Sequence, residues 1–289
     1  MVRKDVRLLS GVGLAALCFL GTPSLVLAQG YLGGNLTPYA VMAGTTVTCT
    51  ESAGPAIITG EVGVSPGAAL VGFGGAPCDS GTLRIPPASD SGKADLVTAY
   101  NTLNALPCAS TVGPNLAGLT LTQGVYCVGA AVSNLTGTLT LDAEGNPNAV
   151  FVFQMSSTLI TSPNSIVSLT NTGGGAVTAC SVQWQVDSSA VLDTNTTFIG
   201  NILALTAITL NAGTNLTGRA LARNAAVTLD SNLVSFAACG AAATAGAPPP
   251  FPAIGVPTLP EIGRWVLLML LLGSGVYLVS RRSRATGGR

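Results

Sequence analysis

Residues 189–230 read SAVLDTNTTFIGNILALTAITLNAGTNLTGRALARNAAVTLD and contain one short string three times. The string SAVLD at 189–193 returns as AITLN at 207–211, eighteen residues further on, and as AVTLD at 226–230, nineteen residues after that. Each copy alternates its side chains as a half-buried strand does. A repeat of this length with two or three short strands per period indicates a β-solenoid, whose coils bury apolar side chains against their neighbours.

A second string keeps the same period, because GNILA at 200–204 returns as GRALA at 218–222. Stacking of equivalent residues puts Leu192, Leu210 and Leu229 in one interior column. Weaker copies of the first string precede it, at 137–142 (GTLTLD) and 157–161 (STLIT). A β-sandwich of unrelated strands is the alternative, but it gives no reason for matched strings at a nearly constant spacing.

Residues 89–106 read SDSGKADLVTAYNTLNAL and break this pattern. Their apolar side chains recur at helical spacing, at Leu96, Ala99, Leu103 and Leu106. Asp90 can cap the start of a helix, and Pro107 ends it. We predict one helix of about four turns, which lies along one face of the solenoid and covers it.

The 289-residue chain has 8% charged residues and no histidine, so catalytic or zinc-binding sites that need histidine are excluded. Its charges are segregated, with three basic residues in 1–28 and five in 263–289. Residues 29–240 carry four basic and ten acidic side chains, a net charge of −6. An acidic body with four scattered cations does not hold nucleic acid by its phosphates, so no nucleic-acid partner is expected.

The first 28 residues have the pattern of a secretory signal peptide. Three basic residues precede an apolar run from Val12 to Leu20, and small residues lead to Gln29. We predict cleavage after Ala28. A retained membrane anchor is the weaker alternative, because the apolar run is short.

The C-terminal end has three parts: a Pro/Ala/Gly linker at 241–255, the string VPTLPEIG at 256–263, and an apolar run at 265–280 with a basic end. This tail, residues 256–289, resembles bacterial sorting tails of the IPTL type, although Trp265 follows the glycine instead of preceding it. The resemblance implies a transmembrane segment at 265–280, a sorting protease that removes it, and a place at the cell surface. A permanent membrane anchor is the alternative.

Six cysteines remain after removal of the signal peptide, and an even number in an exported chain indicates disulfides. No CxxC motif is present, which argues against a zinc or thiol redox site. Six cysteines allow 15 pairings. Proximity in sequence favours the set Cys49–Cys78, Cys108–Cys127 and Cys180–Cys239.

Several longer strings, in order, resemble the secreted ice-binding proteins. They are AVMAGTTVT at 40–48, GEVGVSPG at 60–67, ADLVTAYN at 94–101, LTLTQGVY at 119–126, NAVFVFQ at 148–154 and GRALARN at 218–224. The resemblance covers about residues 31–236 of the predicted domain at 29–240. It implies a mainly β fold: a right-handed discontinuous β-solenoid (β-helix) with one long α-helix packed alongside. In that family the N-terminal strands join the stack beside the last coils, and many members bind ice through one flat face.

An ice surface is therefore the expected partner, and no cofactor or metal is expected. A strand exposes alternate residues, so the expected outward positions are 189, 191 and 193, then 207, 209 and 211, then 226, 228 and 230. The string TAIT at 206–209 resembles those found on ice-binding faces. The candidate binding residues are Thr206, Thr209, Thr228, Ser189, Val191, Ala207, Thr194, Thr214, Thr158, Thr138 and Thr140, with Thr196 as a further surface threonine.

Two alternatives stay open at this point. Val191, Asp193 and Asp230 interrupt a pure threonine row, which a cell-surface adhesin or a structural solenoid tolerates better than an ice binder. An inverting glycosidase is the other, because Asp193 and Asp230 lie about 9–10 Å apart by strand spacing and carboxylate pairs of that class are about 6.5–9.5 Å apart. Asn211 lies between them and aromatic residues are only 5% of the chain, so we expect no enzyme.

Overall fold

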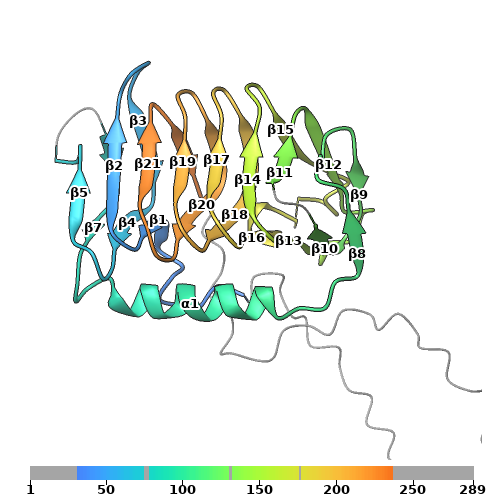
Figure 1. The fold of residues 1–289 in the computed structure, drawn as a ribbon, viewed down its shortest axis with the longest axis horizontal. Coiled ribbons are helices and arrows are strands. Elements are labelled where there is room, and N and C mark those ends of the chain that lie inside the picture. The colour runs from blue at the N-terminus through green and yellow to red at the C-terminus, as the bar shows by residue number, and fades with distance from the viewer. Residues whose placement is uncertain (1–30, 75–77, 130–131, 176, 237–289) are drawn as a thin grey trace, which may run out of the picture. The chain divides into compact units, whose positions relative to one another are not determined.

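The computed structural model describes residues 31–74, 78–129, 132–175 and 177–236. One sheet has seven strands and forms what we call the seven-stranded face (Figure 1). Its strands, in spatial order, are β11 (Val132–Leu135), β14 (Thr158–Thr161), β17 (Ala190–Leu192), β19 (Ile208–Leu210), β21 (Val227–Asp230), β2 (Thr46–Thr50) and β5 (Ala69–Val71).

The second sheet has fifteen strands and makes two further faces, because β18 (Thr197–Ala204) and β20 (Asn215–Ala222) bend between them. Their second halves belong to the helix face, with β8 (Ser110–Val112), β10 (Gly124–Val128), β13 (Phe151–Met155), β16 (Val182–Val186), β1 (Tyr39–Ala43), β4 (Glu61–Val64) and β7 (Leu83–Arg84). Their first halves belong to the third face, with β9 (Thr120–Leu121), β12 (Thr138–Asp142), β15 (Ile166–Thr170), β22 (Leu233–Ser235), β3 (Ala56–Thr59) and β6 (Cys78–Ser80).

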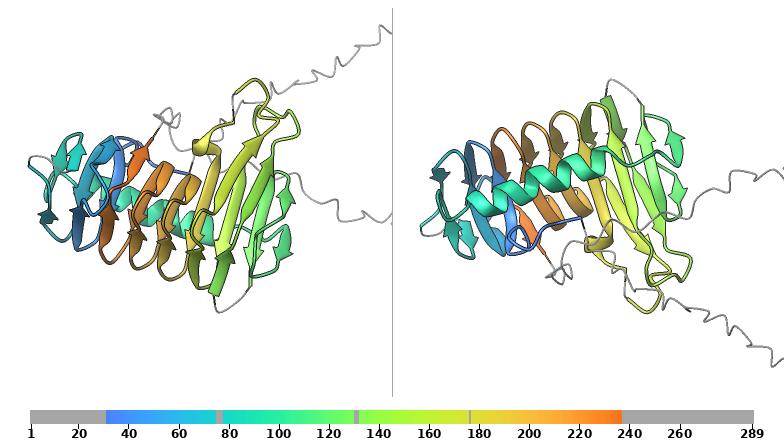
Figure 2. Two further views of the ribbon diagram at one scale, coloured as in Figure 1. Left: turned by 90° about the horizontal axis from the view of Figure 1, so that it is seen from above. Right: turned by 90° about the horizontal axis from the view of Figure 1, so that it is seen from below.

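The stack is discontinuous along the chain, as the resemblance implies. β1, β2 and β3 pair with β20, β21 and β22, so the N-terminal coil packs on the last coil of the C-terminal part. The chain then forms β4 to β7, runs back as the helix, and begins again at β8 at the opposite end of the stack (Figures 1 and 2). The predicted β-solenoid with one helix alongside is therefore confirmed.

The interior is built from columns of equivalent side chains. Leu192, Leu210 and Leu229 are fully buried and lie in register, as predicted. Toward the other end the coils enclose an aromatic column, in which the rings of Phe153 and Trp184 stack with centroids 4.0 Å apart. Each coil contributes one member of a column, so the core is continuous only where coils are stacked.

Helix α1 (Asp90–Asn104) covers the helix face and buries Leu96, Ala99 and Leu103, three residues of the predicted stripe. It is shorter than the predicted 89–106. Ser89 is the N-cap residue in place of Asp90, and no side chain caps that end; the Asp90 carboxylate instead accepts a hydrogen bond of 2.7 Å from the hydroxyl of Ser65.

The solenoid also satisfies the other end of the helix. The side-chain amide of Gln154, in β13, donates hydrogen bonds of 2.7 and 2.8 Å to the carbonyl oxygens of Leu103 and Leu106. The Leu103 carbonyl also accepts from the N–H of Leu106 at 3.3 Å, so the Gln154 amide adds to the backbone bonding that ends the helix. The helix is thus held at both ends by residues of the coils that it covers.

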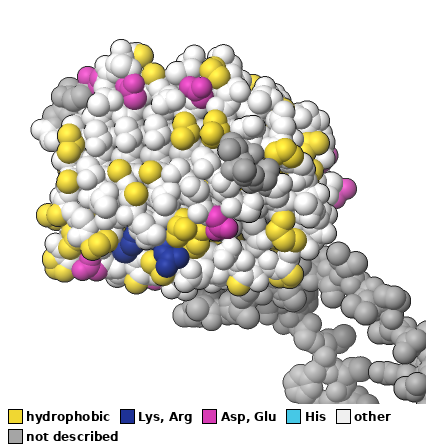
Figure 3. Space-filling model, viewed as in Figure 1, with side chains coloured by type: hydrophobic (Ala, Val, Ile, Leu, Met, Phe, Trp, Pro, Cys, Tyr) yellow, Lys and Arg dark blue, Asp and Glu magenta, His cyan; other side chains and the backbone are white. Residues whose placement is uncertain are grey.

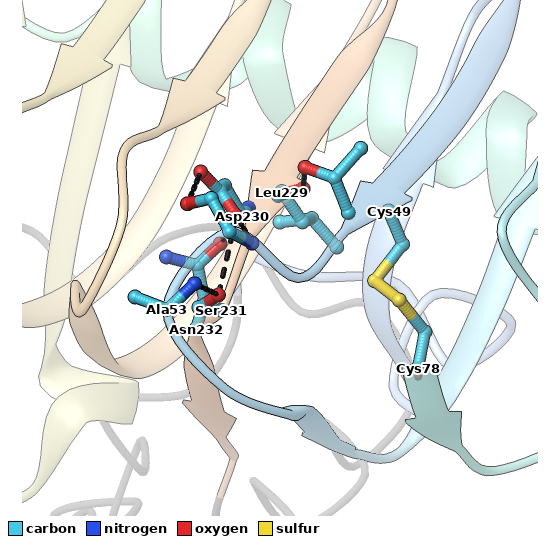
Figure 4. Close-up of a disulfide and its surroundings, with 9 residues drawn as sticks. Cys49, Ala53, Cys78, Leu229, Asp230, Ser231 and Asn232 are labelled. Atoms are coloured by element: carbon cyan, nitrogen blue, oxygen red, sulfur yellow. Dashed lines mark hydrogen bonds between the residues drawn. A yellow bond between two sulfur atoms is a disulfide. The ribbon is translucent and has the colours of Figure 1, made fainter. Parts of the chain in front are cut away.

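Two of the predicted disulfides are confirmed, and each joins an end coil to the next coil inward. Cys49 of β2 is bonded to Cys78 of β6 at one end (Figure 4), and Cys108 is bonded to Cys127 of β10 at the other. Cys180 is buried and disulfide-bonded. Its predicted partner Cys239 lies outside the described residues, as do the predicted signal peptide 1–28, linker 241–255 and tail 256–289.

Arg219 is fully buried at the joint between the N-terminal coil and the last C-terminal coil. Its guanidinium donates to the carbonyl oxygens of Tyr39 and Thr37 and to the side-chain oxygen of Asn201, each at 3.0 Å, and it lies over the ring of Phe236. Burial lowers the pKa of Arg219 to about 10. This side chain therefore ties together segments that are 180 residues apart in sequence.

We predict that Gly218→Ala destabilises the fold by at least about 2 kcal/mol. Gly218 has a φ of +147° at the bend of β20, and an added Cβ would overlap the carbonyl oxygen of Gly200 in the neighbouring coil. Gly113→Ala is the matched control, because nothing lies within 4 Å of its Cβ position. Urea denaturation of both variants tests this, and equal midpoints would contradict it.

We also predict that stability rises with pH between about pH 8 and 10. Burial of the ammonium group, and then the nearby Arg223, lower the pKa of Lys93 from 10.5 to about 8. Its Nζ atom is buried without a hydrogen-bond partner in the described part of the chain. The unfolded chain then holds more protons than the folded chain across this window, so the free energy of unfolding increases with pH. Lys93→Met should flatten the profile measured by urea denaturation; parallel profiles would refute the assignment.

Candidate functional site

The seven-stranded face carries an unbroken row of outward side chains that we call the central row. Strand pairing puts equivalent residues side by side along the whole sheet. Neighbours in such a row are about 4.8 Å apart. The row consists of Asn134, Ile160, Val191, Thr209, Thr228, Thr48 and Val71.

Six of these seven side chains are β-branched, which restricts them to few rotamers. Three threonines, Thr209, Thr228 and Thr48, are consecutive, and none of the seven is charged. The row is exposed or half-buried throughout, with the largest exposure at Ile160, next to one end, and at Val71, the other end, which are 36% and 51% exposed. The result is a stiff, regular and uncharged surface.

A second row flanks the central row, two residues earlier on each strand. Its members are small, half-buried or exposed side chains on the same surface. Thr46 and Ala69 are paired directly. The row consists of Thr158, Ser189, Ala207, Ala226, Thr46 and Ala69.

Charged residues lie at the edges of this face and not at its centre. Figure 3 looks onto it and shows acidic side chains along the upper edge, and two Lys or Arg side chains together with further acidic side chains toward the lower edge. The acidic edge includes Asp193 and Asp230, at the ends of β17 and β21. The outward positions predicted for the three repeated strings are confirmed, since none of them is buried. The carboxylates of Asp193 and Asp230, however, lie at the border of the seven-stranded face.

Both edge carboxylates are engaged in local hydrogen bonds. Asp193 accepts from the backbone N–H of Thr194 at 2.7 Å and from the side-chain amide of Asn211 at 3.1 Å. Asp230 accepts from the hydroxyl and, at 2.7 Å, from the N–H of Ser52, next to the turn drawn in Figure 4. These bonds lower the pKa of Asp230, with the Ser52 hydroxyl as the largest cause. Such a carboxylate is a structural turn residue and a poor general acid.

The predicted binding residues divide between this face and other places. Thr209, Thr228, Val191, Ser189, Ala207 and Thr158 lie on it. Thr206 lies at the turn before β19, where its hydroxyl is bonded to that of Ser189 at 2.7 Å. Thr194 lies in the turn after β17, at the acidic edge.

Four of the predicted surface threonines are not on this face. Thr214 and Thr196 are fully buried, so their assignment as surface residues is wrong. Their hydroxyls hold turns together, since that of Thr214 donates to the carbonyl oxygen of Asp193 at 3.0 Å and that of Thr196 is bonded to the hydroxyl of Thr161 at 2.9 Å. Thr138 and Thr140 are outward residues of β12, which belongs to the third face.

Residues from the N-terminal coil are missing from the predicted set. Thr48 and Thr46 extend the two rows beyond Thr228 and Ala226, and Val71 ends the central row. The alternating string TTVTCT at 45–50 contained the signal. The family resemblance implies that the N-terminal strands join the last coil, and this string could have been placed on the seven-stranded face for that reason. A search for local repeats does not reveal that contact.

Other chemistry has little support in the described residues, where no group of three or more His, Cys, Asp or Glu side chains could hold a metal ion. Arg223 donates to the side-chain oxygen of Asn101 at 3.0 Å and lies over the ring of Tyr100, so it fastens the helix to the solenoid. Among the described residues, neither Arg219 nor Arg223 forms an ion pair with Asp230.

A family model, known sequences and solved structures all match this chain to ice-binding proteins. Residues 41–235 match the ice-binding-like family. An ice-binding protein from Nostoc sp. (strain HG1) is 47% identical over 206 residues, covering 71% of this chain and 73% of that protein. Ice-binding protein 1 of Shewanella frigidimarina is 34% identical over 235 residues, which cover 26% of that longer protein.

Two solved structures agree in fold over the same region. The crystal structure of an ice-binding protein from the Antarctic ascomycete Antarctomyces psychrotrophicus has a TM-score of 0.64 and 34% identity, covering 70% of this chain and 96% of that chain. The DUF3494 domain of the Shewanella protein also has a TM-score of 0.64, with 31% identity over 71% of this chain and 96% of that chain. The chain therefore belongs to the ice-binding-like family.

Proposed function

We propose that this protein binds ice through its seven-stranded face, with the central row at the middle of the contact. The observation that supports this most directly is the unbroken, uncharged register of the central row across all seven strands. The family and its ice-binding relatives support the same ligand.

The mechanism follows from regularity and stiffness. Threonine methyl groups order the water next to them, and the hydroxyls anchor that water by hydrogen bonds. The β-branched side chains lose little rotamer entropy when they contact a lattice. Many weak contacts over a rigid surface then add up to adsorption that is effectively irreversible, and ice growing between bound molecules must curve, which costs free energy.

The edge carboxylates favour this reading over the alternatives. Charged groups hold liquid-like water, but Asp193 and Asp230 lie outside the two rows and are occupied by local hydrogen bonds. The bonds to Asp230 lower its pKa, whereas a glycosidase acid needs a raised one. We therefore propose a non-catalytic role, and an adhesin or structural solenoid without ice activity is the outcome that the first experiment below would reveal.

We further propose that the chain is exported and attached at the cell surface. The support is the signal-peptide pattern at 1–28 and the sorting-tail pattern at 256–289. No helix in the described residues is long and apolar enough to cross a membrane, and the expected segment at 265–280 lies outside them. The proposed partners are ice, a sorting protease, and the membrane before processing.

The solenoid should fold without the tail, because a solved relative is covered to 96% by about this region alone. On residues 29–240, Thr209→Tyr, Thr228→Tyr and Thr48→Tyr should each remove most of the thermal hysteresis and ice recrystallisation inhibition, because a protruding ring separates the surface from the lattice. Thr138→Tyr on the third face is the matched control and should retain activity. Melting temperatures should change by less than about 4 °C, as expected for outward-facing side chains that make no core contact.

Each result has a distinct meaning. Loss of activity in Thr138→Tyr but not in the other three variants would move the binding surface to the third face. A folded wild-type protein with no ice activity would contradict the proposed function, and binding to cells would then be measured.

Attachment can be tested in the protein's own host. Deletion of 265–280 should shift the protein from the cell surface to the culture medium without changing its ice activity. Mass spectrometry of the surface form distinguishes the two kinds of attachment, since processing removes the tail whereas a permanent anchor retains it. Secretion of the intact wild-type chain into the medium would contradict attachment of either kind.

A further inference from the structure

The two ends of the stack are open layers of strands. At what we call the β7 end, β5, β6 and β7 each pair with a single strand, on the inner side, and β6 has one further bridge, from Cys78 to Phe73, among the described residues. At what we call the β8 end, the same holds for β8 and β9. Figures 1 and 2 show these strands as the outermost layers. Strand edges of this kind are ready to pair with another strand.

The β7 end also exposes core side chains. Leu83 lies opposite Val62, which is fully buried in an interior column, yet Leu83 is 39% exposed because no further coil of the described residues covers it. Ile85, just beyond it, is 46% exposed. Leu70 and Phe73 of the same coil are only partly buried against the core. The last layer of the core is therefore in contact with water.

The β8 end also leaves core side chains partly uncovered, and it differs from the β7 end, whose edge strands carry Asp79 and Arg84. Val112, Leu119 and Leu121 are partly buried against the core. Residues 96–141 contain no Asp, Glu, Lys or Arg, so this end lacks the charges with which natural sheets block their edges. Repeat proteins normally place polar capping repeats at such positions. Here each end coil is held by a disulfide, and within the described ranges no capping repeat covers it.

We propose that the β7 end of one molecule stacks on the β8 end of a second copy, head to tail. All strands are parallel, so the two ends are opposite sides of the same ladder and match in direction. β7 and β8 both belong to the helix face, and β6 and β9 both belong to the third face. A second copy fits as the occupant, because its own end coil presents parallel strand edges in the same arrangement of faces.

Such stacking is heterologous, so it leaves a free end on each side and permits chains longer than two. The central row of one copy would continue into the next, because the stack preserves the face to which each strand belongs. Two linked faces bind one surface with an effective concentration that neither has alone. The association itself does not depend on ice binding, so it can be tested separately.

The test uses sedimentation velocity on residues 29–240 at concentrations up to about 1 mM. Wild type should form dimers and longer species as concentration rises. Leu83→Lys/Ile85→Lys blocks the β7 end, and Ser110→Lys/Thr120→Lys places charges on the exposed edge strands of the β8 end. Each blocked variant should be monomeric alone. Mixed in equal amounts, they should form a dimer and nothing larger, because each retains the end that the other lacks.

Thr197→Lys, on an exposed position of the third face away from both ends, is the control and should associate like wild type. Circular dichroism confirms that all variants are folded. Wild type that stays monomeric at every concentration, or blocked variants that fail to combine, would overturn the proposal. Dimers formed by either blocked variant alone would also overturn it, since they would indicate a symmetric contact.

Discussion

The packing of the N-terminal coil on the last C-terminal coil is the contact on which the rest of this structure depends. Without it, β20, β21 and β22 would end the stack, and their interior side chains would face water. Arg219 marks the importance of the joint, since a buried guanidinium is tolerated only when its donors are satisfied. Two carbonyl oxygens of the N-terminal segment do this, and Phe236 covers the planar group.

The sequence predicts those features that repeat or that lie close together along the chain. The interior leucine column, the helix with most of its buried stripe, and two disulfides with local loops all follow from spacing. The joint does not, because no local pattern relates residues 46–50 to residues 227–230. It was expected only through resemblance to a family in which the same arrangement occurs.

The candidate site shows where a pattern is ambiguous. Every face of the solenoid needs inward side chains at alternate positions, so the string TLTLD at 138–142 fits the third face as well as the seven-stranded face. The sequence also does not show which turn residues are buried. Thr214 is buried and Thr209 faces outward because the neighbouring coils pack differently around the two residues. Strand pairing resolves both questions, and it brings Thr48 next to Thr228.

The discontinuity sets an order of events during synthesis. Strands β1 to β7 leave the ribosome first, but the inner edges of β1, β2 and β3 have no neighbour until residues 215–235 have been made. The strands in the first quarter of the chain therefore keep an unpaired edge until the last strands have been made. Pairing between segments so far apart in sequence gives the fold a high contact order, which slows folding. The seven-stranded face is completed last, where the first strands of the polypeptide meet the last ones, so a chain that stops before residue 227 would lack its middle.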